Sequence, residues 1–204
     1  KEIHHRVKNN MQVISSLLEL QSRYTKDPEA TAMFRESQDR IRSMALIHEK
    51  LYKTKDLSRV DFADYLHTLG EMMSRSYGGT RAGVRIVVEA SPAHLGVDTA
   101  IPVGLILNEL VTNAMKHAFT ESMSGSVTIR FSGEGERRYQ LVLEDDGIGL
   151  PSTFSLEADT TLGLRLLRIL TEQVDGTLTF TPKARGSSFR LGFTDASRET
   201  SSPR

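Results

Sequence analysis

The chain changes its hydrophobic period once, and that change most constrains its fold. Residues 1–24 and 28–53 place apolar side chains at helical spacing, and "TKDPEA" between them supplies a helix cap and a proline in the first turn. After residue 84 the pattern becomes that of β-strands, in "VRIVVEA", "SVTIRFSG", "YQLVLEDDG", "TLTFTP" and "SSFRLGF". Two helices, at 101–119 and 162–175, lie between these strands. The sequence therefore predicts a helical region followed by an α/β domain.

The two N-terminal helices are joined by a short turn, so we expect an antiparallel helical hairpin. Two helices alone cannot bury both apolar stripes. A second copy would complete a four-helix bundle, and we expect such a homodimer; packing of the hairpin on its own C-terminal domain is the alternative. A polar connector (53–59) and a short helix (61–76) lead into an α/β sandwich, in which a mixed sheet is covered by helices on one face. The expected units are the hairpin at 1–55, the sandwich at 60–194 and a disordered tail at 195–204.

Composition excludes several classes of function. The 204 residues include 26 basic and 26 acidic side chains, so net charge gives no reason to bind nucleic acid or an anionic membrane. The chain has no cysteine, which excludes disulfides, thiolate metal sites and a cysteine nucleophile. Its most apolar stretch, "IPVGLILNELV", is interrupted by polar residues and is too short to span a bilayer. No secretion signal is visible, and we expect a cytoplasmic fragment whose sensor domain lies upstream of residue 1.

The helix "GLILNELVTNAMKHAF" alternates apolar and polar side chains. Glu109 and Asn113 are one turn apart and present oxygens to the same region, and Lys116 follows about one turn later. A carboxylate, a carboxamide and an ammonium on one face suit a magnesium-bound triphosphate, because Mg²⁺ prefers oxygen ligands and phosphates attract a cation. For this helix alone, a solvated polar face is the alternative.

The segment "LEDDGIGLP" ends a strand in acidic residues. The carboxylate of Asp145 can accept a hydrogen bond from an exocyclic amine such as that of adenine. Gly147 and Gly149 follow, and they allow the backbone to turn sharply and to approach a ligand closely. Taken by itself this segment is an ordinary turn.

Two later segments can contribute to the same pocket. "TTLGLRLL" places Thr161 and Gly163 at the start of a helix, whose free N–H groups attract anions. "ARGSSFRLGF" places Gly186 and Ser187 at the start of a strand, where they can form a wall of the pocket. Each segment is a weak signal, but their order and spacing together are specific.

In this order the segments resemble the N, G1, G2 and G3 boxes of histidine-kinase ATP-binding domains. That GHKL (Bergerat) superfamily also includes gyrase, MutL and a heat-shock chaperone. "EIHHRVKNNMQVISSLLELQSR" and "RIRSMALIHEKLY" resemble the dimerisation and phosphotransfer hairpin of the HisKA type 2 kinases, relatives of the HWE kinases. The resemblance covers residues 1–193. It departs from the HWE group at Asn108, where that group has histidine, and from the G2 pattern in having one glycine and a short lid (150–161).

The resemblance implies a sensor histidine kinase core that autophosphorylates a histidine from ATP and passes the phosphoryl group to a response-regulator aspartate. Asn113 would coordinate Mg²⁺, with Glu109 as a metal-shell or water-orienting carboxylate. Lys116 would approach the phosphates, and His117 would flank the nucleotide. Asp145 would bind the adenine amine. Further contacts with ATP are expected at Gly147, Gly149, Thr161, Gly163, Gly186 and Ser187.

Helix geometry distinguishes the paired histidines of "KEIHHRVKNN". The apolar stripe of this helix is centred on Val7, Ile14 and Leu18. At about 100° per residue, His5 lies roughly 160–170° from that centre, whereas His4 lies only about 60–70° away. His5 is therefore expected to face water, and the resemblance also makes it the phosphoacceptor. A zinc site is disfavoured, because adjacent histidines point apart and no third ligand lies at zinc-like spacing.

The residues around His5 carry further expectations. Arg6 and Gln12 are expected to meet a receiver domain. Asn9, one turn after His5, could orient a water for phosphatase activity, a hypothesis that Asn9→Ala would test through dephosphorylation of a phosphorylated partner. Because Arg6 stands where many kinase families place an acid, the general base stays open, with Glu2 as a candidate.

Two other functions compete with the kinase. One is a nucleotide-binding or dimerisation module whose pocket has degenerated, and the joint retention of Glu109, Asn113, Lys116 and Asp145 argues against it. The other is an ATPase or serine kinase of the same superfamily, and the hairpin that carries His5 argues against it.

Overall fold

The computed structural model describes the backbone of six segments and most of their side chains. The side chains of residues 2–6, 8, 43, 47–53 and 77 are outside that description. The described segments are 2–53, 59–77, 83–120, 123–151, 153–158 and 161–196.

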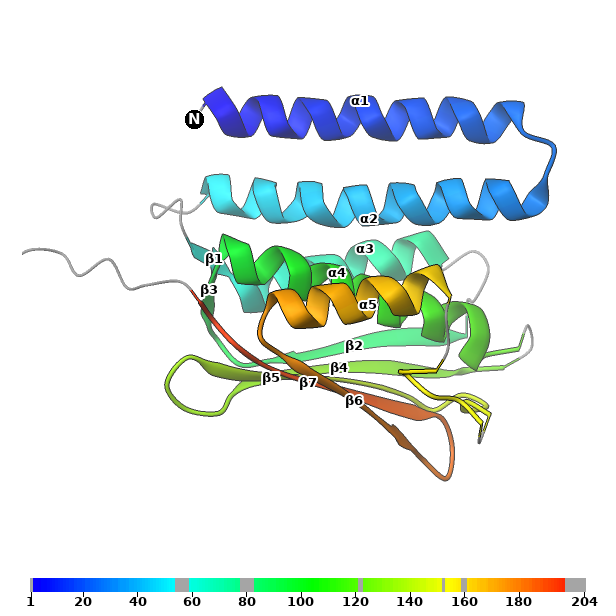
Figure 1. Ribbon diagram of the computed structural model, residues 1–204, viewed down its shortest axis with the longest axis vertical. Helices are drawn as coiled ribbons and strands as arrows, with labels where there is room; N and C mark the ends of the chain where they lie inside the picture. Colours follow the sequence, from blue (N-terminus) through cyan, green and yellow to red (C-terminus); the bar gives the residue numbers. More distant parts are fainter. Residues whose placement is uncertain are drawn as a thin grey trace, which may run out of the picture.

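The N-terminal region is the antiparallel hairpin that the sequence predicts (Figure 1). Helix α1 spans Glu2–Tyr24 and helix α2 spans Pro28–Lys53. Asp27 starts α2, because its carboxylate accepts the Glu29 N–H at 2.9 Å, as a capping residue does. Midway along the hairpin, the Gln38 side chain donates to the Ser15 carbonyl at 3.1 Å and fixes the register of the two helices.

The C-terminal region contains a five-stranded mixed sheet in the order β2-β4-β5-β7-β6. Strands β2 and β4 are parallel, and the other neighbours are antiparallel. Alternate side chains of the central strands point to one face and are buried there, which is the period-two pattern of a half-buried sheet. The strands are β2 Val84–Ala90, β4 Gly125–Gly133, β5 Arg138–Asp145, β6 Thr177–Pro182 and β7 Ser187–Thr194.

Three helices cover this face of the sheet, and the hairpin lies over the helices (Figure 1). They are α3 (Phe62–Tyr77), α4 (Val97–Asn113) and α5 (Leu162–Gln173). A π-helical turn, η1 (Ala114–Ala118), extends α4. The fold is therefore the predicted hairpin followed by an α/β sandwich. Helix α2 packs on α3 and α4, so the hairpin does rest on its own C-terminal domain, while α1 lies on the outside.

The structure adds two short strands that the sequence pattern did not indicate. Strand β1 (Arg59–Asp61) pairs antiparallel with β3 (His94–Gly96). Three residues are too few to display a period, which is why the pattern missed both strands. Within the described segments, no helix is both long enough and apolar enough to cross a bilayer.

The first turn of α4 is held by a residue near the end of the chain. Asp195 is 1% exposed, and its carboxylate accepts the Gly96 N–H at 3.2 Å and the Thr99 hydroxyl at 2.8 Å. A carboxylate at a helix N-terminus satisfies free N–H groups and complements the helix dipole. The ordered sandwich thus includes Asp195, one residue beyond the expected boundary at 194.

We predict that Asp195→Ala lowers the free energy of unfolding by about 1–3 kcal/mol, because buried donors at the start of α4 lose their acceptor. Asp195→Asn keeps one acceptor oxygen and should lose less. Urea denaturation of the two variants and the wild type measures the difference. Equal stability of Asp195→Ala and the wild type would show that solvent replaces this cap at no cost.

Candidate functional site

One cavity of about 190 Å³ opens between α4, α5 and the ends of β5 and β7. Five of its lining residues are polar and were expected from the sequence to contact a nucleotide or its metal ion, and one expected glycine, Gly149, also lines it. Apolar side chains from the helices and the sheet form the remaining wall. The five polar residues are Asn113, His117, Asp145, Thr161 and Ser187.

Asp145 is the buried acid of this cavity, with 3% of its surface exposed. Its carboxylate accepts a hydrogen bond from the Gly147 N–H at 2.9 Å, and Ser187 lies beside it. An ionised carboxylate offers about four acceptor positions, so Asp145 can accept from a further donor. Burial raises the pKa of Asp145, and the hydrogen bonds from Gly147 and Ser187 partly oppose that rise.

Two glycines make room for this arrangement. A side chain at Gly147 would lie 2.1 Å from the Ala118 carbonyl oxygen, and that same oxygen accepts the Ile148 N–H at 2.8 Å. Gly186 has φ +80°, and a side chain there would lie 1.9 Å from the Asp145 carbonyl oxygen. Both glycines lie behind the cavity wall and let neighbouring backbones touch at the acid.

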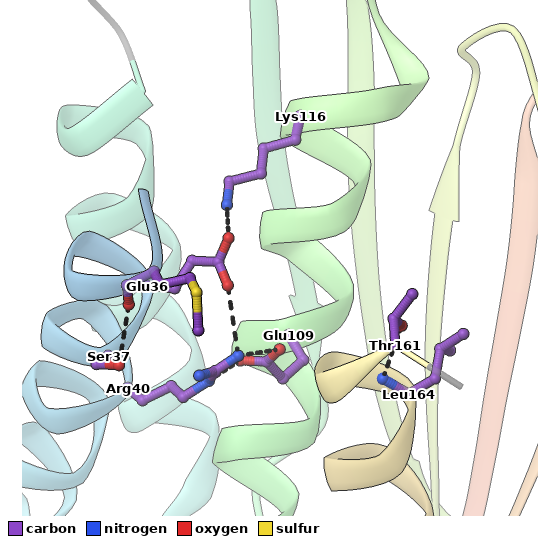
Figure 2. Close-up of polar contacts among 8 residues, drawn as sticks. Glu36, Ser37, Arg40, Glu109, Lys116, Thr161 and Leu164 are labelled. Carbon is purple, nitrogen blue, oxygen red and sulfur yellow. Dashed lines mark hydrogen bonds and ion pairs between the residues drawn. The ribbon is translucent and has the colours of Figure 1, made fainter. Parts of the chain in front are cut away.

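The start of α5 faces the opposite side of the cavity. Thr161 caps the helix, since its hydroxyl accepts the Leu164 N–H at 3.4 Å (Figure 2). The N-terminus of a helix carries free N–H groups and partial positive charge, which suits phosphate groups. Thr160, next to this cap, lies outside the described residues.

The lid between β5 and α5 is anchored by residues that the sequence motifs did not single out. The Phe154 ring lines the cavity and meets the Phe180 and Phe189 rings at centroid distances of 5.0 and 6.3 Å. Arg168 on α5 donates to the carbonyls of Leu156 and Glu157 at 3.3 and 2.8 Å. These contacts join residues 11 to 35 positions apart, beyond the reach of a local pattern.

Glu109 and Lys116 are not among the residues that line the cavity. They lie between α4 and the hairpin, in a row of alternating charges that we call the charge ladder: Lys116, Glu36, Arg40 and Glu109 (Figure 2). Two nitrogens of the Arg40 guanidinium donate hydrogen bonds to the Glu109 carboxylate, and one of them, Nη2, lies 2.9 Å from Oε2. Lys116 pairs with Glu36. The hydrogen bond to Glu109 raises the pKa of Arg40.

Glu109 nonetheless borders the start of α5. A side chain at Gly163 would lie 3.1 Å from Glu109 Oε2, so this carboxylate sits between Arg40 and the first turn of α5. The expected metal-binding pair is therefore split in this conformation. Asn113 faces the cavity and Glu109 faces the hairpin.

The expected phosphotransfer residues lie on α1. Asn9 and Gln12 are exposed. The backbone of His5 and Arg6 is helical, and their side chains lie outside the description, so the exposure of the His5 ring stays a prediction.

The cavity fits a nucleotide in chemistry and in size. Its volume is below the roughly 300–1,000 Å³ of pockets that enclose drug-sized ligands, which suits a base held inside with its phosphates extending outward. Asp145 can accept from an exocyclic amine, and the start of α5 can receive phosphates. For Mg²⁺, the Asn113 carboxamide in the cavity wall offers an oxygen ligand, the type of ligand that this ion prefers.

Comparisons with known proteins agree with this fold and site. A family model described as "Histidine kinase" matches residues 2–77, and one described as "Histidine kinase-, DNA gyrase B-, and HSP90-like ATPase" matches residues 98–197. The chain is 38% identical over 180 residues to sensor histidine kinase PdtaS of Mycobacterium tuberculosis (strain CDC 1551 / Oshkosh), covering 87% of this chain and 35% of that protein.

A second relative is blue-light-activated histidine kinase 2 of Erythrobacter litoralis (strain HTCC2594), 29% identical over 192 residues, covering 91% of this chain and 54% of that protein. The histidine kinase domain of the Erythrobacter litoralis EL346 blue-light activated histidine kinase has the same fold, with TM-score 0.74 and 20% identity over 96% of this chain and 95% of that domain. The chain thus spans about a third of the first of these relatives and just over half of the second. It belongs to the sensor histidine kinase family, with a HisKA_2-type hairpin and a GHKL-type ATPase domain.

Proposed function

We propose that this chain is the kinase core of a sensor histidine kinase, in which the sandwich binds Mg²⁺·ATP and His5 receives the γ-phosphoryl group. The observation that carries the proposal is the buried, hydrogen-bonded Asp145 in a cavity that also contains Asn113 and the capped start of α5. Asp145 accepts from the adenine amine, and the phosphates extend toward Thr161. In this proposal the hairpin (1–55) is the phosphotransfer unit and the sandwich (60–194) the catalytic unit.

The chemistry follows from the groups that the chain supplies. A neutral imidazole nitrogen of His5 attacks the γ-phosphorus in line, and the bond from that phosphorus to the bridging oxygen breaks, which leaves ADP. Asn113 contributes a ligand to Mg²⁺, which, when bound, offsets charge on the phosphate oxygens. Lys116 adds a second cation once it has left Glu36. The phosphohistidine then passes its phosphoryl group to an aspartate of a receiver domain, which meets the exposed Asn9 and Gln12.

His5 does not lie beside the cavity of its own chain in this conformation. The contact between Ser15 and Gln38 fixes the hairpin register, and His5 is ten residues, or about 15 Å, from Ser15 along α1. Glu36, which pairs with Lys116, lies on the other side of the Ser15–Gln38 contact from His5, toward the turn of the hairpin. Transfer therefore requires either a movement of the sandwich along the hairpin or the sandwich of a second chain.

A second copy is also favoured by the outer surface of α1. Val13, Leu17, Leu20 and Tyr24 are 52–84% exposed and follow one another at spacings of four, three and four residues. That spacing makes a continuous apolar seam of the kind that two helices share. The seam lies opposite the face that packs on α2. We propose that it pairs with the seam of a second chain in a four-helix bundle.

We predict that the wild-type chain is a dimer and that Leu17→Glu makes it a monomer, because a charge in the middle of the seam is costly to bury. Size-exclusion chromatography with light scattering gives the mass. Gln12→Glu is the matched control, since it adds the same charge to an exposed position on another face of α1 and should leave the dimer intact. A monomeric wild type would contradict the prediction.

We predict that γ-labelled ATP with Mg²⁺ transfers label to the chain as an acid-labile, alkali-stable adduct, and that His5→Gln and chelation of Mg²⁺ each abolish it. Alkali stability and acid lability identify phosphohistidine, and a receiver domain that accepts the phosphoryl group should remove the label. An acid-stable adduct, or free phosphate alone, would favour the serine kinase or ATPase. An unlabelled chain would favour a degenerate binding module.

We predict that Asp145→Asn weakens Mg²⁺·ATP binding by about 10- to 150-fold, the loss of one hydrogen bond to a charged acceptor. Because burial raises the pKa of Asp145, the apo chain protonates this carboxyl at a higher pH than a free aspartate does. Protonation removes the acceptor, so wild-type affinity should fall as pH decreases through the raised pKa, and Asp145→Asn should show no such dependence. Calorimetric titration across pH measures both effects, and a pH-independent wild type would exclude Asp145 as the acceptor.

A further inference from the structure

Two residues of α2 bind Lys116, which the proposed function assigns to the phosphates, and Glu109, which the family resemblance places in the metal shell. Glu36 and Arg40 are one helical turn apart and point toward α4. Arg40 donates hydrogen bonds to both carboxylate oxygens of Glu109, and the Glu36 carboxylate accepts one from the Lys116 ammonium (Figure 2). Arg40 also lies 3.6 Å from Glu36, which closes the charge ladder.

The charge ladder is largely withdrawn from solvent at the Glu109 end. The Glu109 side chain is 5% exposed and the Arg40 side chain 15% exposed, while Glu36 and Lys116 are each 32% exposed. A buried ion whose partner is removed is strongly destabilised, so Glu109 needs a cation at this position. In the described conformation that cation is Arg40.

The same two groups cannot serve the hairpin and the nucleotide at once. A Mg²⁺ ion at Glu109 would lie against the Arg40 guanidinium, and two cations there would repel each other. A phosphate oxygen at Lys116 would lie beside the Glu36 carboxylate, and two anions there would repel each other. The charge ladder contains two acids and two bases, so its charges are already balanced without a ligand.

We propose that Glu36 and Arg40 form a docking surface on α2 that binds the sandwich through Lys116 and Glu109, in competition with Mg²⁺·ATP. This inference rests on the proposed function, because the competing ligand is the one assigned to the cavity. Docking and nucleotide binding then weaken each other by the same factor, as linkage requires. The described conformation is the docked one. Mg²⁺·ATP releases the sandwich from α2 and so frees it to reach a His5.

The test compares the binding of Mg²⁺ with a non-hydrolysable ATP analogue to the whole chain and to two variants. Arg40→Ala and Glu36→Gln should each bind more tightly than the wild type, within the about 5- to 150-fold range of typical coupling between sites. Glu36→Gln leaves the Arg40–Glu109 pair in place, so it stays informative if Arg40→Ala fails to fold. Arg23→Ala is the matched control, because Arg23 is an exposed arginine of the same hairpin that pairs with Glu19 on its own helix, and its affinity should equal that of the wild type.

Hydrogen exchange along α2 gives a readout independent of catalysis. Amides around Glu36 and Arg40 should exchange faster when the analogue is bound to the wild type, and already without it in Arg40→Ala. Unchanged or weaker binding in both variants, with unchanged exchange, would overturn the docking surface, even where label on His5 upholds the proposed function. A wild type that binds no Mg²⁺·analogue would instead overturn the proposed function, and the competition with it.

Discussion

The burial of α4 on all sides is the constraint on which the rest of the structure depends. Of its 17 residues, 13 are buried, because the sheet, α5 and the hairpin each cover part of it. Buried polar side chains of such a helix are stabilised by partners from neighbouring elements, although Asn108 Oδ1 is buried without a hydrogen bond from any described residue. Glu109 finds Arg40 on one side, and Asn113 opens into the cavity on another. The position of every candidate site residue on this helix follows from that burial.

The π-helical turn at the end of α4 also directs neighbouring polar side chains to different sides. It follows Asn113 directly and contains Lys116 and His117. Turns of this kind are wider than an α-helical turn and are frequent at functional sites. Here His117 lines the cavity while Lys116 reaches the hairpin. Adjacent residues of one helix therefore contact the cavity on one side and the hairpin on the other.

The periodic features of the sequence predicted most of the fold. Helical spacing indicated the hairpin, and β-branched runs indicated all five strands of the sheet, because both signals are local. The strand that ends at Asp145 and the helix that starts beside Thr161 were recognisable for the same reason, and the structure does bring these two residues to one cavity.

The partner of Glu109 could not be predicted. Glu36 and Arg40 are four residues apart, so in the sequence they indicate only an ordinary pair on the surface of one helix. Arg40 is 69 positions from Glu109, and the choice of that partner depends on how α2 packs on α4. The contacts of Arg168 with the lid and the short pairing of β1 with β3 also join segments that are distant in the sequence, so local patterns did not indicate them. Local patterns indicate which residues share an element, whereas packing decides which residues of separate elements meet.

The pairing of Arg59 with Asp195 gives α4 a second link to the hairpin. Arg59 opens β1, the first described residue after α2, and its guanidinium lies 3.8 Å from the carboxylate that holds the start of α4. The hairpin is thus linked to both ends of α4, through the chain connection at one end and through Lys116 and Glu109 toward the other. Asn113 lies on this helix between Glu109 and Lys116, so the hairpin holds the helix on both sides of this cavity residue.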